Sequence, residues 1–205
     1  MNSGITNISE TELKILEAAK KVFMVKGMAG ARMQEIADAA GINKALLHYY
    51  FRSKEKLFEK ILDETFANII PNILNIFTSD IPIFDKIRKF FDEHLSFLQS
   101  NMYLPVFILH EINQDPQRFV RLIEKTKISP KKILETQLKK EIENGIIKPI
   151  STEDFLTNLL SLSVFTIAAA PMLKSIFKMD DKKLKQFIDN RKKSLAEFVI
   201  DAIKK

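Results

Sequence analysis

The chain has 205 residues, of which 46% are apolar and 28% are charged. That length can bury roughly 70% of the unfolded surface in one or two cores. The sequence contains no Cys, which excludes disulfide bonds, cysteine-ligated zinc and thiolate catalysis. The 32 basic and 26 acidic side chains give a net charge of +6, which suits a polyanionic partner without identifying one.

Helices are the expected secondary structure throughout. Only five Gly are present, the seven Pro fall at breaks between periodic segments, and no run alternates apolar and polar residues. We therefore predict an all-α protein. Residues 1–9 are polar and contain no basic, apolar leader, and the lack of Cys fits a reducing compartment, so we expect a cytoplasmic location.

A short amphipathic helix is predicted at the start of the chain. Ser9 and Glu12 form a capping-box pattern that opens it, and Gly27 is suited to end it. A second helix is predicted over residues 33–40.

A tight turn at 41–43 leads to a third helix over residues 44–50, for which Asn43 supplies the N-cap. Ser53 then caps a fourth helix, which is predicted to run to about Ile70. Residues 1–52 therefore form one small three-helix domain, and residues 53–205 are assigned to a second, helical domain.

The second domain repeats the same signals. An amphipathic helix is predicted over residues 80–100. Asp115-Pro116 and Ser129-Pro130 each place a capping side chain before a proline suited to a first helical turn, so each opens a further helix. Asn144-Gly145 ends the second of these.

Residues 155–173 form an unusual run of 19 residues without a charge, close to the roughly 20 needed to span a bilayer. The run contains six polar or proline positions, which favours a helix that is buried on two sides in a soluble assembly. Ser151 and Asp154 cap this helix. The last helix of the chain is predicted to line one face with Leu184, Phe187, Ile188, Arg191, Leu195, Phe198 and Ala202.

The spacing between residues 33 and 51 predicts two short helices that cross at a sharp turn. Ala37 is small enough for a close crossing, and Gly41 can take the positive φ that turns the chain. Ile36, Ile42 and Leu47 are apolar where the helices meet. This pattern indicates a helix-turn-helix, whose second helix enters the DNA major groove.

The outward face of that second helix supplies the candidate DNA-reading residues. With Leu47 pointing inward, a step of roughly 100° per residue directs Ala45 and Tyr49 outward, with Leu46 and His48 beside them. Residues 39–54 contain three cations and no acid, a basic strip suited to phosphate contact; the cations are Lys44, Arg52 and Lys54.

The segment from Leu13 to Leu57 resembles the DNA-binding domain of the TetR family of bacterial transcriptional regulators. The residues that carry the resemblance are Ile15-Leu16-Glu17-Ala18-Ala19, Val22-Phe23, Lys26-Gly27, Ile36-Ala37-Asp38-Ala39-Ala40-Gly41-Ile42, Asn43-Lys44, Tyr49-Tyr50-Phe51 and Ser53-Lys54-Glu55. The resemblance covers about a fifth of the chain and implies the roles of several residues. By this resemblance, Lys44, Tyr49 and Lys54 would contact phosphates, and Ala45, Leu46 and His48 would contact bases.

Two positions depart from the family pattern. Where the family often has a hydroxyl cap before the second helix, this chain has Ala31-Arg32, so we expect Arg32 to replace the phosphate contact with a longer reach. Where the family often has Gly-Thr in the reader helix, this chain has Ala45-Leu46. Leu46 cannot donate a hydrogen bond, and we expect it to contact a thymine methyl group.

A single reader helix spans few bases, and such proteins dimerise so that two helices meet successive major-groove faces. The uncharged helix and the last helix are the expected interface, as in TetR-like proteins, which dimerise in a four-helix bundle. The predicted interface residues are Phe155, Leu159, Leu162, Thr166, Phe187, Leu195 and Phe198.

The resemblance also implies a small-molecule site inside the C-terminal helices, whose occupation changes DNA binding. Aromatic side chains can supply its wall, so an apolar or aromatic effector is expected. The predicted pocket residues are Phe90, Phe97, Tyr103, Phe107, His110 and Phe165. The resulting hypothesis is a homodimeric repressor that a small apolar ligand releases from its operator.

Enzymatic and cofactor chemistry finds no support in the sequence. His110-Glu111 begins like a zinc-protease motif but lacks the second His, no carboxylate lies three residues before any His, and there is no glycine-rich phosphate loop. We expect no metal and no cofactor. Two alternatives stay open: a helical membrane-associated or protein-binding protein that uses residues 155–173, and a DNA-binding regulator without a ligand.

Overall fold

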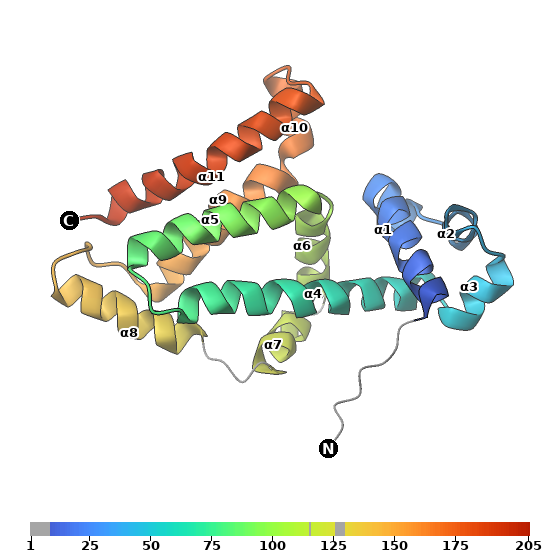
Figure 1. Ribbon diagram of the computed structural model, residues 1–205, viewed down its shortest axis with the longest axis horizontal. Helices are drawn as coiled ribbons and strands as arrows, with labels where there is room; N and C mark the ends of the chain where they lie inside the picture. Colours follow the sequence, from blue (N-terminus) through green and yellow to red (C-terminus); the bar gives the residue numbers. More distant parts are fainter. Residues whose placement is uncertain (1–8, 115, 126–129) are drawn as a thin grey trace. The chain divides into compact units, whose positions relative to one another are not determined.

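The computed structural model describes residues 9–114, 116–125 and 130–205, and the prediction of an all-α protein is confirmed for them (Figure 1). The described residues contain no strand, only an isolated bridge between Ile147 and Lys204. The helices are α1 (Glu10–Gly30), α2 (Met33–Ala40), α3 (Lys44–Tyr50), α4 (Lys54–Thr78), α5 (Ile83–Ser100), α6 (Leu104–Gln114), α7 (Pro116–Lys125), α8 (Pro130–Glu143), α9 (Thr152–Ala168), α10 (Ala170–Ile176) and α11 (Asp181–Ile203).

Contacts along the backbone divide the chain into two compact units. The first ends at Asn68 and the second begins at Ile69, so the division lies inside α4. The sequence-based division after residue 52 stays a prediction. Each unit has its own buried apolar side chains.

In the N-terminal unit, the capping residue and the glycine identified in the sequence act at the positions where they were expected. Ser9 Oγ accepts the amide of Glu12 at 3.1 Å, so the predicted cap of α1 is confirmed. Gly27 takes φ +65° and interrupts the helical geometry of α1 before the helix resumes to Gly30. The core behind α2 and α3 contains Phe23 and Phe58, whose rings meet edge to face at 4.8 Å between centroids.

Helix α4 is longer than predicted. The sequence placed its end at about Ile70 and the prolines of the chain at breaks between periodic segments, but the helix continues through Pro71 to Thr78. Proline in a helix interior costs roughly 3 kcal/mol. The last turns bury Leu74, Ile76 and Phe77, each at most 4% exposed, and the burial of three large apolar side chains outweighs that cost.

The C-terminal unit is built around α5, which packs against α8, α9 and α11 (Figure 1). Its core includes Phe90, Phe91 and Leu95 on α5. The unit also buries Lys86, which is 2% exposed. The Lys86 ammonium donates to the carbonyl of Phe77 at 2.7 Å and to Gln137 Oε1 at 2.5 Å. It thereby ties the end of α4 to α5 and α8, and desolvation lowers the pKa of Lys86.

The remaining helices of the C-terminal unit can be compared with the prediction at three points. Helix α6 was not predicted. Gly145, at φ +69°, follows the end of α8 as expected. Asp115 and Ser129, the predicted caps of α7 and α8, lie outside the described residues.

The uncharged run forms two helices rather than one. Ser151 Oγ accepts the amide of Asp154 at 3.0 Å, which confirms the predicted N-cap of α9. Helices α9 and α10 then meet at an angle of 64°. Among the described residues no single helix has the length and apolar character needed to cross a membrane, although this bent pair passes the same test on length and composition.

Candidate functional site

The turn between α2 and α3 closes as the helix-turn-helix pattern requires. Gly41 takes φ +68°, which residues other than glycine adopt at a cost. Its amide donates to the carbonyl of Asp38 at 3.1 Å, and the amide of Ile42 donates to the carbonyl of Ala37 at 3.0 Å. Two of the last carbonyls of α2 are thus satisfied while the chain turns.

The inward face of the two helices is fully covered. Ile36, Ala37 and Leu47 are each 0% exposed. Leu47 anchors α3 to the unit, so the side chains on the other faces of this seven-residue helix are held in fixed directions.

The outward face of α3 is open to solvent, as its helical spacing predicts. Lys44, Ala45, Leu46, His48 and Tyr49 are all classed as exposed, with Leu46 at 36% and Tyr49 at 80%. A leucine and a tyrosine exposed side by side on one short helix are available for contact with a partner.

Hydrogen bonds at both ends fix the reader helix. The Asn43 side chain accepts the amide of Leu46 at 2.8 Å, which confirms it as the N-cap. At the other end, His48 Nδ1 lies 3.3 Å from the carbonyl of Arg52, and the Tyr49 and Tyr50 rings meet edge to face at 5.5 Å between centroids.

Two cations flank the start of α2. Arg32 is exposed and occupies the N-cap position without a side-chain cap hydrogen bond, as the missing hydroxyl in Ala31-Arg32 led us to expect. Lys54 is half-buried and donates to the carbonyl of Ala31 at 3.2 Å. Glu35 on α2 accepts a hydrogen bond from Lys26 on α1 at 2.8 Å. This bond lowers the pKa of the Glu35 carboxyl, so the acid stays ionised and paired.

The predicted pocket residues lie at different depths in the C-terminal unit, and their joint role in a pocket stays a prediction. Phe90 is 1% exposed and packs against Phe77 and Phe91 with centroid distances of 5.6 and 5.5 Å. Phe97, Tyr103 and Phe107 are half-buried, whereas Phe165 is 60% exposed. The side chain of His110 lies outside what the structure describes.

A buried polar pair in the C-terminal unit joins α5 to α9. His94, 5% exposed, places Nδ1 3.0 Å from Ser163 Oγ, and Ser163 also donates to the carbonyl of Leu159 at 2.9 Å. Burial lowers the pKa of His94 to about 4, so the imidazole is neutral at pH 7. Ser163 was not predicted as a partner, because the two residues are 69 positions apart and no local pattern relates them.

The predicted dimer residues fall into two groups. Phe155, Leu159, Thr166 and Leu195 are at most 4% exposed and are covered by their own chain, so they offer no surface to a second copy. Leu162 and Phe187 are half-buried, and Phe198 is 64% exposed.

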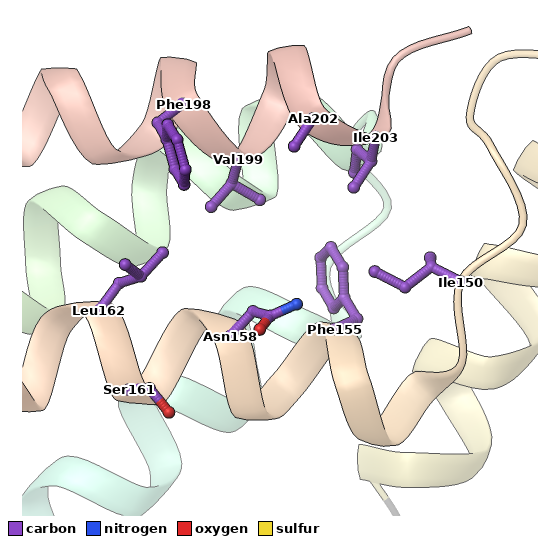
Figure 2. A pocket seen from close by; sticks show the side chains of 9 residues that line it. All are labelled: Ile150, Phe155, Asn158, Ser161, Leu162, Phe198, Val199, Ala202 and Ile203. Carbon is purple, nitrogen blue, oxygen red and sulfur yellow. The ribbon is translucent and has the colours of Figure 1, made fainter.

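A cleft of about 240 Å³ opens between α9 and α11 (Figure 2). Phe198 and Val199 lie on the α11 side, and Leu162 and Asn158 on the α9 side. The lining residues are Ile150, Phe155, Asn158, Ser161, Leu162, Phe198, Val199, Ala202 and Ile203. Apart from Asn158 and Ser161 the lining is apolar. In the described residues, no group of three or more His, Asp or Glu side chains could hold a metal ion.

Comparison with known proteins agrees with this geometry. Residues 15–61 match the model of the family "Bacterial regulatory proteins, tetR family". The chain is 43% identical over 58 residues to the transcriptional repressor NicS of Pseudomonas putida, covering 28% of this chain and 27% of NicS. With curated relatives such as this one, the matched segments span 27 to 52% of the relative's length, less than two thirds.

Solved structures resemble the chain over nearly its whole length. A linker-substituted mutant of HlyIIR is 25% identical with a TM-score of 0.63, and the likeness covers 96% of each chain. The regulator FadR of Bacillus subtilis, solved with stearoyl-CoA, has a TM-score of 0.63 at 18% identity over 92% of this chain and 97% of FadR. The family match lies on the helix-turn-helix and the likeness in fold extends through the C-terminal helices, so the chain is similar to regulators of the tetR family.

Proposed function

We propose that this protein is a dimeric transcriptional repressor that binds operator DNA through α3 and leaves it when a small molecule binds the C-terminal unit. The observation that carries the proposal is the outward face of α3, where exposed side chains stand on a helix anchored by Leu47. Acting on DNA, the protein would work in the cytoplasm. It would have no catalytic role.

Base recognition is assigned to three neighbours on the exposed part of α3. Ala45 and Leu46 offer apolar contact to thymine methyl groups, and His48 can donate or accept a hydrogen bond at a base edge. All three are classed as exposed, which supports this assignment.

Phosphate contact is assigned to the residues that border this face. Lys44 and Arg32 are exposed cations, Tyr49 has an exposed hydroxyl-bearing ring, and Lys54 lies next to Ala31 at the start of α2. Asn43 acts indirectly by fixing the first turn of α3. Such contacts position a protein on DNA without reading its sequence.

Dimerisation is proposed through the exposed faces of α9 and α11. Two reader helices are needed to cover two half-sites about one helical turn apart. Leu162, Phe165, Phe187 and Phe198 carry apolar surface there, and the cleft of about 240 Å³ opens on the same two helices. A four-helix bundle made by two copies would cover this surface.

An apolar or aromatic effector is proposed for the interior of the C-terminal unit. The regulator FadR was solved with stearoyl-CoA, a ligand with a long apolar chain. In this chain Phe97, Tyr103 and Phe107 are half-buried, and Phe97 packs against the core, where a ligand could extend the apolar packing. Thermal-shift screening of apolar metabolites tests this, since a ligand at 100 times its dissociation constant adds about 2.7 kcal/mol of stability.

The DNA-binding proposal is tested by fluorescence anisotropy with the duplex upstream of the protein's own gene and with a scrambled duplex. We expect selective binding whose affinity falls steeply with salt. Lys44→Ala should lower the salt slope by about one unit, because it removes one phosphate contact. Lys182→Ala, an exposed cation on α11, is the matched control and should not change the slope. Failure to select any sequence from random DNA would refute the proposal.

A further inference from the structure

One face of α11 carries two residues of opposite charge, Arg191 and Asp201, for which the described residues offer no ion-pair partner. A step of roughly 100° per residue directs Arg191, Ser194, Phe198 and Asp201 into a sector of about 80° on that helix. This sector lies beside the one that holds Ile188, Leu195 and Val199, which are buried in the core of the chain itself. Helix α11 therefore has two adjacent faces, one internal and one free.

Arg191 is a half-buried cation without an anionic partner among the described residues. Its Nε donates to Thr166 Oγ1 at 3.0 Å, and its guanidinium lies 5.6 Å from the Phe187 ring centroid. Desolvation lowers its pKa from the ordinary value. The acids nearest to it on α11 are engaged elsewhere: Asp189 with Lys192 at 2.9 Å and Glu197 with Arg88 at 2.9 Å.

Asp201 is an acidic residue of α11 that, like Arg191, lacks a partner of opposite charge among the described residues. The other acids of α9 and α11 all have partners: Glu153 pairs with Lys131, Asp181 with Lys174, and Asp154 accepts from Ser151. In the described part of the chain, Asp201 is exposed and has neither an ion pair nor a side-chain hydrogen bond. It cannot reach Arg191 of its own helix, because ten residues of helix rise by roughly 15 Å.

A second copy packed antiparallel across a two-fold axis would satisfy both groups. Such an axis relates residues in reciprocal pairs, so each contact occurs twice. Pairing residue 191 with residue 201 puts the axis level with residue 196, and that level also sets residue 194 against residue 198. A small Ser194 would then face the large, exposed Phe198 of the other copy, on both sides of the axis.

We propose that Arg191 of each copy binds Asp201 of the other, and that these two ion pairs set the register of the dimer. This inference rests on the proposed function, which requires a dimer through α9 and α11. The pairs form at a seam that is otherwise apolar, where the guanidinium is already partly desolvated. There a charge-assisted hydrogen bond contributes more than it does in water.

The test is a charge swap followed by sedimentation velocity of the full-length protein over a range of concentrations. Arg191→Asp and Asp201→Arg each place like charges opposite one another, and each should raise the dimer dissociation constant by about tenfold or more. The double variant Arg191→Asp with Asp201→Arg restores opposite charges and should return the constant to within about threefold of the original. Because Asp201 is exposed, Asp201→Arg tests the pairing even if the Arg191 variant folds poorly.

Glu197→Arg is the matched control. It reverses a charge on the same helix but breaks the internal pair with Arg88, so the dimer constant should change by less than about threefold. A dimer that is indifferent to both single reversals, or a double variant no better than the singles, would overturn the inference. An original protein that stays monomeric at every concentration would instead refute the proposed dimer itself.

Discussion

Acid should destabilise the protein through one buried imidazole. His94 is 5% exposed, its Nδ1 is held by Ser163, and burial lowers its pKa to about 4 from the ordinary 6.5. Below pH 6.5 the unfolded chain therefore takes up a proton that the folded chain does not. The stabilisation is complete above the unfolded pKa and is lost progressively as the pH falls from 6.5 towards 4.

The magnitude follows from the two pKa values. Each unit of separation corresponds to 1.36 kcal/mol, so the full loss is about 3 kcal/mol and the loss at about pH 4.5 is about 2.5 kcal/mol. That is a large fraction of the 5–15 kcal/mol typical of a folded protein. Carboxylates such as Glu35, whose pKa is lowered by Lys26, add to the same trend below about pH 4.5.

Urea unfolding at about pH 7 and pH 4.5, followed by circular dichroism, measures this loss. The control is His94→Gln, which keeps a polar side chain able to bond Ser163 but cannot titrate in this range. The original protein should lose about 2.5 kcal/mol more than the variant between the two pH values. Equal losses in the two proteins would show that His94 stays accessible to protons, and the buried neutral state would be refuted.

Substitutions at three positions in the N-terminal unit test its separate parts. His48→Ala should cost about 1–3 kcal/mol on the operator and little on random DNA; equal losses on both duplexes would exclude base reading by His48. Asn43→Ala removes the cap of α3 and should cost about 1 kcal/mol in urea unfolding, whereas Asn43→Ser should retain most of it. Gly41→Ala meets no atom within 4 Å, so only the strain of φ +68° should appear, about 1–2 kcal/mol; a larger loss would indicate a hidden clash.

Much of the N-terminal unit could be predicted from the sequence because its signals are local. The bounds of α2 and α3, the caps at Ser9 and Asn43, and the turn at Gly41 each depend on residues a few positions apart. The exposure of the α3 side chains follows from helical spacing once Leu47 is recognised as the inward residue. These are the features that sequence patterns describe best.

The C-terminal unit was predicted less well because its structure depends on distant contacts. Pro71 is a local signal for the end of a helix, but α4 continues through it because the turns that follow bury Leu74 and Phe77. The bend between α9 and α10 falls at Ala169, where the sequence has no glycine that would predict it. The contacts of Lys86 with Gln137 and of His94 with Ser163 join residues 51 and 69 positions apart, and no periodicity encodes them.

Helices α9 and α11 each bury one side in their own chain and expose another, and the predicted interface residues divide between the two sides. On α9, a side that packs on the core of the chain and an adjacent side that we propose to meet a second copy leave little surface for charge. On α9, Phe155 and Leu159 are covered internally while Phe165 is 60% exposed; on α11, Leu195 is covered while Phe198 is 64% exposed. The sequence analysis placed Phe155, Leu159 and Thr166 on the side that meets a second copy, because helical spacing separates two sides without showing which of them the chain itself covers. Exposure in a single copy separates them, and the exposed set is the one on which interface substitutions should act.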